Sequence, residues 1–202
     1  MTATIVLVAT GVILASCAQP GSGGQQEFYA GGLPSAPVKI EVFSDYQCPS
    51  CRVFYLTALR YVLTDYSMQN RVSVVYHDLP LQGHRYSREA SRYALAAQRL
   101  GREYWARLTE AFYEDQTIWS HDGRLDVIAM SVLGQADFAR IKTILQNPAI
   151  EQELEGELAL AAARQVRSTP TFFLYSKSGV QRIEGAVPYS VLKVYLDRLL
   201  KQ

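Results

Sequence analysis

Two cysteines separated by two residues, Cys48 and Cys51, are the feature of this sequence that most constrains its fold and chemistry. The pair follows an alternating apolar stretch at residues 38–43 and precedes a run of helical spacing that starts at Val53. A Cys-x-x-Cys pair between a strand and a helix is typical of thiol–disulfide exchange centres. The third cysteine, Cys17, lies far upstream, so the sequence predicts a single redox pair rather than a disulfide framework.

The position of the pair at the start of a helix predicts different roles for its two sulfurs. Pro49 is favoured in a first helical turn because its fixed φ suits the helix and its missing N–H needs no partner there. Free N–H groups and the helix dipole stabilise a thiolate, so we expect a lowered pKa for Cys48. Cys51 lies on the same helical face. We predict that Cys48 is the exposed nucleophile and Cys51 the buried, resolving thiol. Pro49 and Ser50 would support the site.

Two other interpretations of the cysteine pair follow from the residues alone. Half of a structural zinc site would need a second Cys or His pair at a similar spacing, which His77, His84 and His121 do not provide. An inert structural disulfide would also fit the spacing. The position between a strand and a helix argues against it, because that position is typical of exchange centres. We expect no metal and no cofactor at this site.

A second motif, Thr-Pro-Thr-Phe-Phe, occupies residues 169–173, and Pro170 heads an expected strand, where no ladder donor is lost. With Cys-Pro-Ser-Cys at 48–51 and Asp-Leu-Pro-Leu at 78–81, the chain resembles the DsbA-like thiol–disulfide oxidoreductases of the thioredoxin superfamily. The resemblance covers residue 38 to the C-terminus. It implies that the bond before Pro170 is cis and packs beside the cysteines. It also implies that the backbone of Thr169 pairs with the substrate chain.

Three residues depart from the pattern of the family that the sequence resembles. Val42 stands six places before Cys48, where many relatives have an acidic residue that assists proton transfer. Its neighbour Glu41 should face the opposite side of the strand. Ser50 stands where the strongest oxidants of the family have His, so it offers a hydroxyl without a positive charge. Ser168 stands where many relatives have Gly before the Thr-Pro step.

The N-terminus predicts export. Residues 3–16 are apolar or small and precede Cys17, which resembles a bacterial lipobox. The resemblance implies a signal peptide at 1–16 and a lipid on the sulfur of Cys17, although residues 1–4 lack the usual Lys or Arg. An uncleaved membrane anchor is the alternative. A bilayer span needs about 20 apolar residues, however, and the run at residues 3–16 is shorter. Residues 17–37 then predict a flexible tether, and both interpretations place the protein in the cell envelope, outside the cytoplasm.

The remaining pattern predicts one domain, residues 38–202, with an α/β thioredoxin fold. Strands are expected at residues 38–43, 72–77, 171–175 and 180–184, and flanking helices at 49–65, 150–165 and 189–201. Residues from about 84 to 148 show helical spacing only. They predict an all-helical insertion between the second strand and the Thr-Pro loop.

These predictions favour an enzyme, a protein thiol–disulfide oxidoreductase that donates disulfides to exported proteins. The resemblance implies a membrane partner that reoxidises it, and we expect a monomer. A net charge of +1 with no basic run favours no nucleic-acid partner. The alternatives are a disulfide reductase or isomerase and a thioredoxin-like chaperone or copper carrier. The segment before Val38 is too short and too poor in apolar residues for the extra domain through which isomerases of this superfamily usually dimerise.

Overall fold

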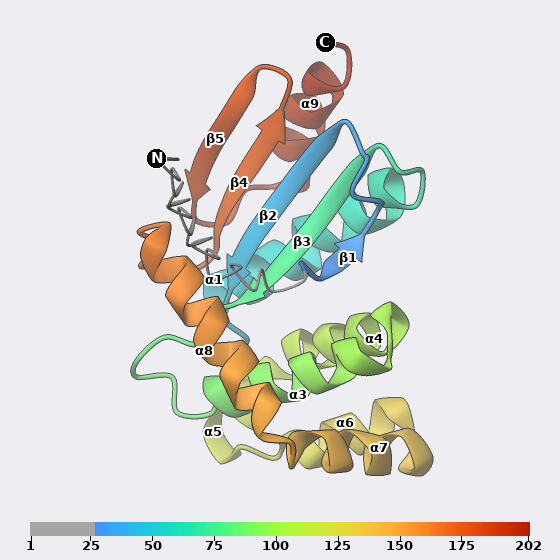
Figure 1. Ribbon diagram of the computed structural model, residues 1–202, viewed down its shortest axis with the longest axis vertical. Coiled ribbons are helices and arrows are strands. Elements are labelled where there is room, and N and C mark those ends of the chain that lie inside the picture. Colours follow the sequence, from blue (N-terminus) through green and yellow to red (C-terminus); the bar gives the residue numbers. More distant parts are fainter. Residues whose placement is uncertain (1–26) are drawn as a thin grey trace, which may run out of the picture.

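A five-stranded mixed sheet forms the centre of the computed structural model, which describes residues 27–202 (Figure 1). The strand order is β1-β3-β2-β4-β5. Strands β2 and β3 are parallel, and the other neighbouring pairs are antiparallel. The strands are β1 (Tyr29–Gly31), β2 (Val38–Ser44), β3 (Val72–Asp78), β4 (Thr171–Ser176) and β5 (Gly179–Glu184).

Helices lie behind the sheet, one long helix lies at the lower end of its front face, and most of the remaining helices gather below that end (Figure 1). After β2 the chain forms α1 (Pro49–Phe54), η1 (Tyr55–Leu59), α2 (Arg60–Val62) and η2 (Leu63–Ser67), in which η1 and η2 are π-helical. The helices after β3 are α3 (Ser87–Leu100), α4 (Arg102–Glu114), α5 (Gln116–Asp122), α6 (Leu125–Leu133) and α7 (Gln135–Leu145). Helix α8 (Pro148–Ala163) returns to the sheet, and α9 (Tyr189–Leu199) follows β5. Within residues 27–202 no helix is long and apolar enough to cross a membrane.

The predicted α/β fold is confirmed, including the helical insertion between β3 and the Thr-Pro loop. Helix α5 lies inside the predicted insertion but was not predicted as a separate helix, because its seven residues are too few for a periodic apolar face to be recognised. The four predicted strands and three predicted flanking helices differ from the observed ones by a few residues at their ends, where helices and strands are least well defined by pattern.

The predicted tether is wrong for its C-terminal part, because strand β1 lies inside residues 17–37. Tyr29 pairs with Val75 of β3, so the domain begins before residue 38. Gly32 allows the backbone to approach β3 closely. Gly32 has a φ of +70°, and a Cβ there would come within 2.4 Å of the Val72 carbonyl oxygen. The predicted signal peptide and Cys17 lie outside the described residues.

The two sides of β2 face different environments, since successive side chains of a strand point to opposite faces. Ile40 and Val42 are fully buried in the larger apolar core, together with α1 and the insertion helices. Phe43 faces a smaller apolar cluster that contains Ala161 of α8. This second face also holds a charged network, which begins at Glu41.

Glu41 is 1% exposed and joins three strands to helix α8. Its carboxylate lies 3.1 Å from Nε2 of His77 and accepts a 2.8 Å hydrogen bond from Nη1 of Arg164. Tyr175 donates to the same carboxylate. Nδ1 of His77 lies 2.5 Å from Oε2 of Glu157 on α8. A buried carboxylate is stable only when it is paired in this way, and the network therefore fastens α8 to the sheet.

The network changes the pKa of both central residues. Burial raises the pKa of Glu41, but hydrogen bonds from His77 and Tyr175 and the nearby positive charges outweigh it and lower the pKa to about 2. Burial lowers the pKa of His77, but hydrogen bonds to Glu157 and Glu41 outweigh it and raise the pKa to about 9. His77 is therefore protonated at neutral pH and donates through both ring nitrogens.

Glu41→Gln should lower the free energy of unfolding at pH 7 by roughly 3 kcal/mol, because the buried imidazolium of His77 and the half-buried guanidinium of Arg164 lose their shared partner. Chemical denaturation measures this change. Since the pKa of His77 is raised on folding, its stabilisation is complete below about pH 6.5 and is lost as pH rises through about 9. The difference between wild type and variant should therefore shrink above pH 9.

Glu110→Gln is the matched control, because Glu110 forms a 3.1 Å ion pair with Arg60 at the surface. Exposed pairs contribute at most about 1 kcal/mol, so this variant should remain close to wild type. Equal effects of the two substitutions would show that the buried network does not stabilise the fold.

Candidate active site

The two predicted motifs meet at the end of β2. Phe43 of β2 pairs with Thr171 of β4, which brings the Thr-Pro loop next to the start of α1. The bond between Thr169 and Pro170 is cis. The Sγ atom of Cys48 lies 3.4 Å from the carbonyl oxygen of Thr169. Cysteine and loop are thus in contact although 121 positions separate them in the chain.

Cys48 occupies the N-cap position of α1, with extended backbone angles, and Pro49 is the first helical residue. The Cys51 thiol donates a hydrogen bond to the Cys48 sulfur and is the largest cause of its low pKa. Burial opposes this effect, while Thr169 and the backbone N–H groups of Cys51 and Ser50 add to it. The pKa of Cys48 falls to about 5, so this sulfur is a thiolate at neutral pH.

Cys51 is the more deeply buried of the two sulfurs. It is 0% exposed, whereas Cys48 retains 7% of its surface. Burial raises the pKa of Cys51 well above its ordinary value, and the neighbouring Cys48 raises it further. Both cysteines are free, so the structure represents the reduced pair. We expected an exposed nucleophile, but Cys48 is buried, with its sulfur in contact with the Thr169 carbonyl of the Thr-Pro loop.

A buried carboxylate that we did not predict, Asp45, holds the turn before Cys48. Its Oδ1 atom accepts hydrogen bonds from the backbone N–H of Gln47, at 2.7 Å, and from the hydroxyl of Ser87. Its Oδ2 atom accepts from the backbone N–H of Leu81 at 2.8 Å and lies 2.7 Å from Nδ1 of His84. One fully buried side chain thus ties the cysteine turn to the segment that leads into α3.

Two glutamine side chains connect the same turn to the helical insertion. Nε2 of Gln116, on α5, donates to the carbonyl oxygens of Tyr46 and Cys48, at 2.7 and 3.0 Å. Gln47 donates to the carbonyl oxygen of Ser120 and accepts from the backbone N–H of Tyr86. The insertion therefore holds the backbone that carries Cys48. The buried backbone carbonyls of the turn need these side-chain partners, because no neighbouring strand within residues 27–202 forms hydrogen bonds with the turn.

The structure brings Cys48, Cys51, Thr169 and Pro170 together. Pro49 and Ser50 lie exposed at the same helix start. Glu41 lies on the opposite face of β2, as the alternation predicted, and is engaged by His77 and Arg164. The described residues contain no group of three or more His, Cys, Asp or Glu side chains that could hold a metal.

Sequence reasoning missed the polar groups that surround the cysteines, among them Ser44, Asp45, Gln116 and Tyr113. Asp45 gave one available signal, since it is an acidic residue directly after a buried strand and three places before a redox cysteine. Gln116 and Tyr113 gave none, because they come from the insertion and reach the site only through tertiary packing.

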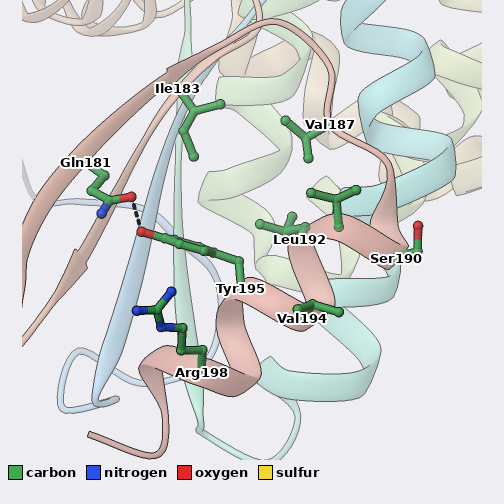
Figure 2. Close-up of a pocket in the computed structure, with 9 residues that line it drawn as sticks. Gln181, Ile183, Val187, Ser190, Leu192, Val194, Tyr195 and Arg198 are labelled. Atoms are coloured by element: carbon green, nitrogen blue, oxygen red, sulfur yellow. Dashed lines mark hydrogen bonds between the residues drawn. The ribbon is translucent and has the colours of Figure 1, made fainter.

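A surface groove of about 540 Å³ lies between β5 and α9 (Figure 2). Apolar side chains that include Ile183 and Val187 line it, and Tyr195 bonds to Gln181 across it (Figure 2). The loop that joins β5 to α9 is bonded to the site, because the backbone N–H of Gly185 donates to the Pro170 carbonyl at 2.8 Å.

Comparison with known protein families supports the chemistry that this geometry indicates. The model of a family described as thioredoxin matches residues 26–197. The chain belongs to the thioredoxin family. The match begins just before β1, in agreement with the position of that strand in the sheet.

Curated proteins and solved structures that are similar to this chain include disulfide bond formation proteins. The disulfide bond formation protein D of Bacillus subtilis is 25% identical over 191 residues, which cover 91% of this chain and 80% of that protein. The crystal structure of Wolbachia pipientis alpha-DsbA1 covers 87% of this chain and 91% of its own, with 16% identity and a TM-score of 0.73. Oxidised BdbD from Bacillus subtilis covers 87% and 94%, with 22% identity and a TM-score of 0.69.

The predicted resemblance to DsbA-like proteins is therefore confirmed, and so is the prediction of a thiol–disulfide oxidoreductase. The solved structures have the same fold as this chain. The roles of its individual residues are inferred from their own positions and contacts.

The ultraviolet absorbance of the reduced protein should report a thiolate that titrates with a midpoint near pH 5, the pKa of Cys48. Cys51→Ala should raise this midpoint, because it removes the thiol that donates to the thiolate. Since the pKa of Cys48 is lowered on folding, its stabilisation of the reduced form is complete above about pH 9 and is lost as pH falls through about 5.

Ser50→Ala is the control for this titration, because it keeps the backbone N–H that faces Cys48. Its midpoint should stay near 5. A wild-type midpoint close to the ordinary thiol value of 9.0 would contradict the assignment of Cys48 as the activated sulfur.

Proposed function

We propose that this protein donates disulfides to exported proteins by exchange at Cys48 and Cys51. The observation that carries the proposal is the position of Cys48 at the N-cap of α1, with its sulfur 3.4 Å from the Thr169 carbonyl and beside the fully buried Cys51, where its pKa is lowered to about 5. A stabilised thiolate favours the reduced form of the pair and so makes the disulfide a better oxidant. The Ser50 hydroxyl adds no positive charge that would stabilise the Cys48 thiolate further.

The reaction follows from the positions of the two sulfurs. A substrate thiolate attacks the Sγ atom of Cys48 in the oxidised pair, and the bond to Cys51 breaks with its electron pair on the Cys51 sulfur. A second substrate thiolate then attacks the substrate sulfur of this mixed disulfide. Cys48 leaves as a thiolate, and the substrate has gained a disulfide. The pair is left with two more electrons, which a membrane partner would remove.

The Thr-Pro loop is the proposed backbone partner of the substrate. The carbonyl oxygen of Thr169 lies 3.4 Å from the Cys48 sulfur, where a substrate chain in a mixed disulfide would have to pass. Thr169 remains partly exposed, whereas Pro170 is buried against the core. We propose that the protein acts as a monomer.

The reduction potential of the pair tests the direction of exchange. Thioredoxin has a thiol pKa of about 7 and a potential of about −270 mV. A pKa of about 5 stabilises the reduced form about 50-fold more at pH 7, and each tenfold change shifts this two-electron couple by about 30 mV. We therefore expect about −220 mV. Structural disulfides of secreted proteins have potentials below about −300 mV, so donation to them would be downhill.

Equilibration of the protein with glutathione measures this potential. A value near −220 mV, or a more oxidising one, supports a disulfide donor. Ser50→Ala should leave it unchanged, and Cys48→Ser should abolish exchange. A potential at or below about −300 mV would make donation uphill and would favour a reductase in place of a donor.

We further propose that the protein is a lipoprotein of the cell envelope, anchored to the membrane through Cys17. The support is the apolar run that ends in Leu-Ala-Ser before Cys17. A lipid anchor would leave the redox domain, which starts at β1, close to the membrane partner that reoxidises it. Exported substrates with free thiols would meet it on the same side.

Cys17→Ala should move the protein from the membrane fraction to the soluble extracytoplasmic fraction, since the lipid-bearing sulfur is removed. Fractionation followed by immunodetection measures this change. Cys48→Ser is the control and should stay with the membrane. Retention of Cys17→Ala in the membrane would point to an uncleaved anchor, and detection of the wild-type protein in the cytoplasm would contradict export.

A further inference from the structure

Exchange at the cysteine pair requires a negative charge on a sulfur that water does not reach. When the bond between the two cysteines breaks, the electron pair stays on Cys51, which is 0% exposed. A buried thiolate is costly unless hydrogen bonds stabilise it. The Cys48 thiolate nearby disfavours it further by repulsion. The protein therefore needs donors that point at Cys51.

Carboxylates do not meet this need. Val42 is the buried residue of β2 on the side of Cys51, and Glu41 turns to the opposite face, where His77 and Arg164 hold it. The Asp45 carboxylate is directed at Leu81 and His84, although the Asp45 backbone N–H lies 3.4 Å from the Cys51 sulfur.

A row of buried hydroxyls reaches the sulfur from the other direction. Ser44 ends β2 directly before Asp45, whose backbone N–H lies 3.4 Å from the Cys51 sulfur, and hydrogen bonding from the Ser44 side chain opposes the rise in the pKa of Cys51. The Oγ atom of Ser44 lies 2.8 Å from the hydroxyl of Tyr113 on α4, and that hydroxyl lies 2.7 Å from the hydroxyl of Tyr76 on β3. Ser44, Tyr113 and Tyr76 are each at most 2% exposed. Three separate elements thus contribute one continuous row.

When Cys51 is a thiolate, the hydrogen bonds of the row can all donate in one direction, toward the Cys51 sulfur. A thiolate only accepts, so Ser44 must donate its single proton to the sulfur. Ser44 then accepts from Tyr113, and Tyr113 accepts from Tyr76. The rings of Tyr46 and Trp105 pack against Tyr76. Hydrogen bonds aligned in this way polarise and strengthen one another.

We propose that Tyr76, Tyr113 and Ser44 form a one-way donor chain that stabilises the Cys51 thiolate during exchange. Ser44 contacts the reacting sulfur, and the two tyrosines are positioning residues that act through it. The chain donates hydrogen bonds and transfers no proton. It therefore favours departure of Cys51 when substrate attacks Cys48. It equally favours the return of the Cys51 thiolate to a mixed disulfide at Cys48, which expels the substrate thiolate.

The test is the rate at which glutathione attacks the oxidised protein in a single turnover at pH 7. A thiol of lower pKa leaves faster, so loss of a donor to Cys51 slows this step. Ser44→Ala should slow it about tenfold, since one hydrogen bond to a charged group is removed. Tyr113→Phe should slow it about threefold and Tyr76→Phe less, because they weaken the chain without breaking its last bond.

Tyr46→Phe is the matched control. Tyr46 is equally buried and packs against Tyr113, but its hydroxyl bonds to Thr109, at 2.9 Å. This variant should keep the wild-type rate. In addition, Tyr113→Phe should have no further effect in the Ser44→Ala background, because its influence passes through Ser44.

A pH profile separates this role from a structural one. The resolving step, in which Cys51 attacks a glutathione disulfide on Cys48, depends on the fraction of Cys51 thiolate. Its profile should move to higher pH in Ser44→Ala and Tyr113→Phe, and stay in place in Tyr46→Phe. The titratable groups that face Cys51 are Cys48 at the start of α1 and Tyr113 on α4, with Tyr76 of β3 beyond them.

The inference rests on the proposed exchange reaction, and the experiment distinguishes the two. A wild-type protein that does not react with glutathione would overturn both. Wild-type exchange with an unchanged Ser44→Ala rate would overturn only the donor chain. Equal slowing by Tyr46→Phe and Tyr113→Phe would also overturn it, because loss of packing would then explain the effect.

Discussion

The pairing of the central strand β2 with β4 is the constraint on which the site depends. Phe43 opposite Thr171 sets the register, and this register places the Thr-Pro loop against the start of α1. The 3.4 Å contact between the Cys48 sulfur and the Thr169 carbonyl is a consequence. A shift of one residue would turn the side chains of β2 to the opposite face and separate the two motifs.

The alternation of β2 also divides the polar chemistry of the protein between two environments. Glu41 points toward α8, where an imidazolium and a guanidinium hold its charge. Ser44 points the other way, toward Cys51 and Tyr113. The full charge that fastens α8 to the sheet is thereby kept away from the buried sulfur of Cys51. Neutral hydroxyls and backbone N–H groups surround that sulfur instead.

The helical insertion takes part in the site as well as enclosing the core. Gln116 of α5 holds the backbone carbonyls on either side of the nucleophile turn. Asp45 ties that turn to the segment before α3, and Tyr113 of α4 extends the hydroxyl row. A thioredoxin-type sheet provides the cysteine helix and the loop, whereas the insertion fixes the geometry between them. The cysteine pair and the Thr-Pro loop therefore share one junction between the sheet and the insertion.

The sequence by itself determined the redox pair, the helix that starts at Pro49, the Thr-Pro loop and the α/β order of elements, because these depend on local spacing and chain direction. It misjudged residues 28–32, since Gly31 and Gly32 are as typical of a tether as of a close approach between strands. Only the tertiary structure decided the surroundings of Cys51. Ser44, Asp45, Gln116 and Tyr113 reach the cysteines from distant elements, and the burial that makes their hydrogen bonds matter exists only once the helices have packed against the sheet.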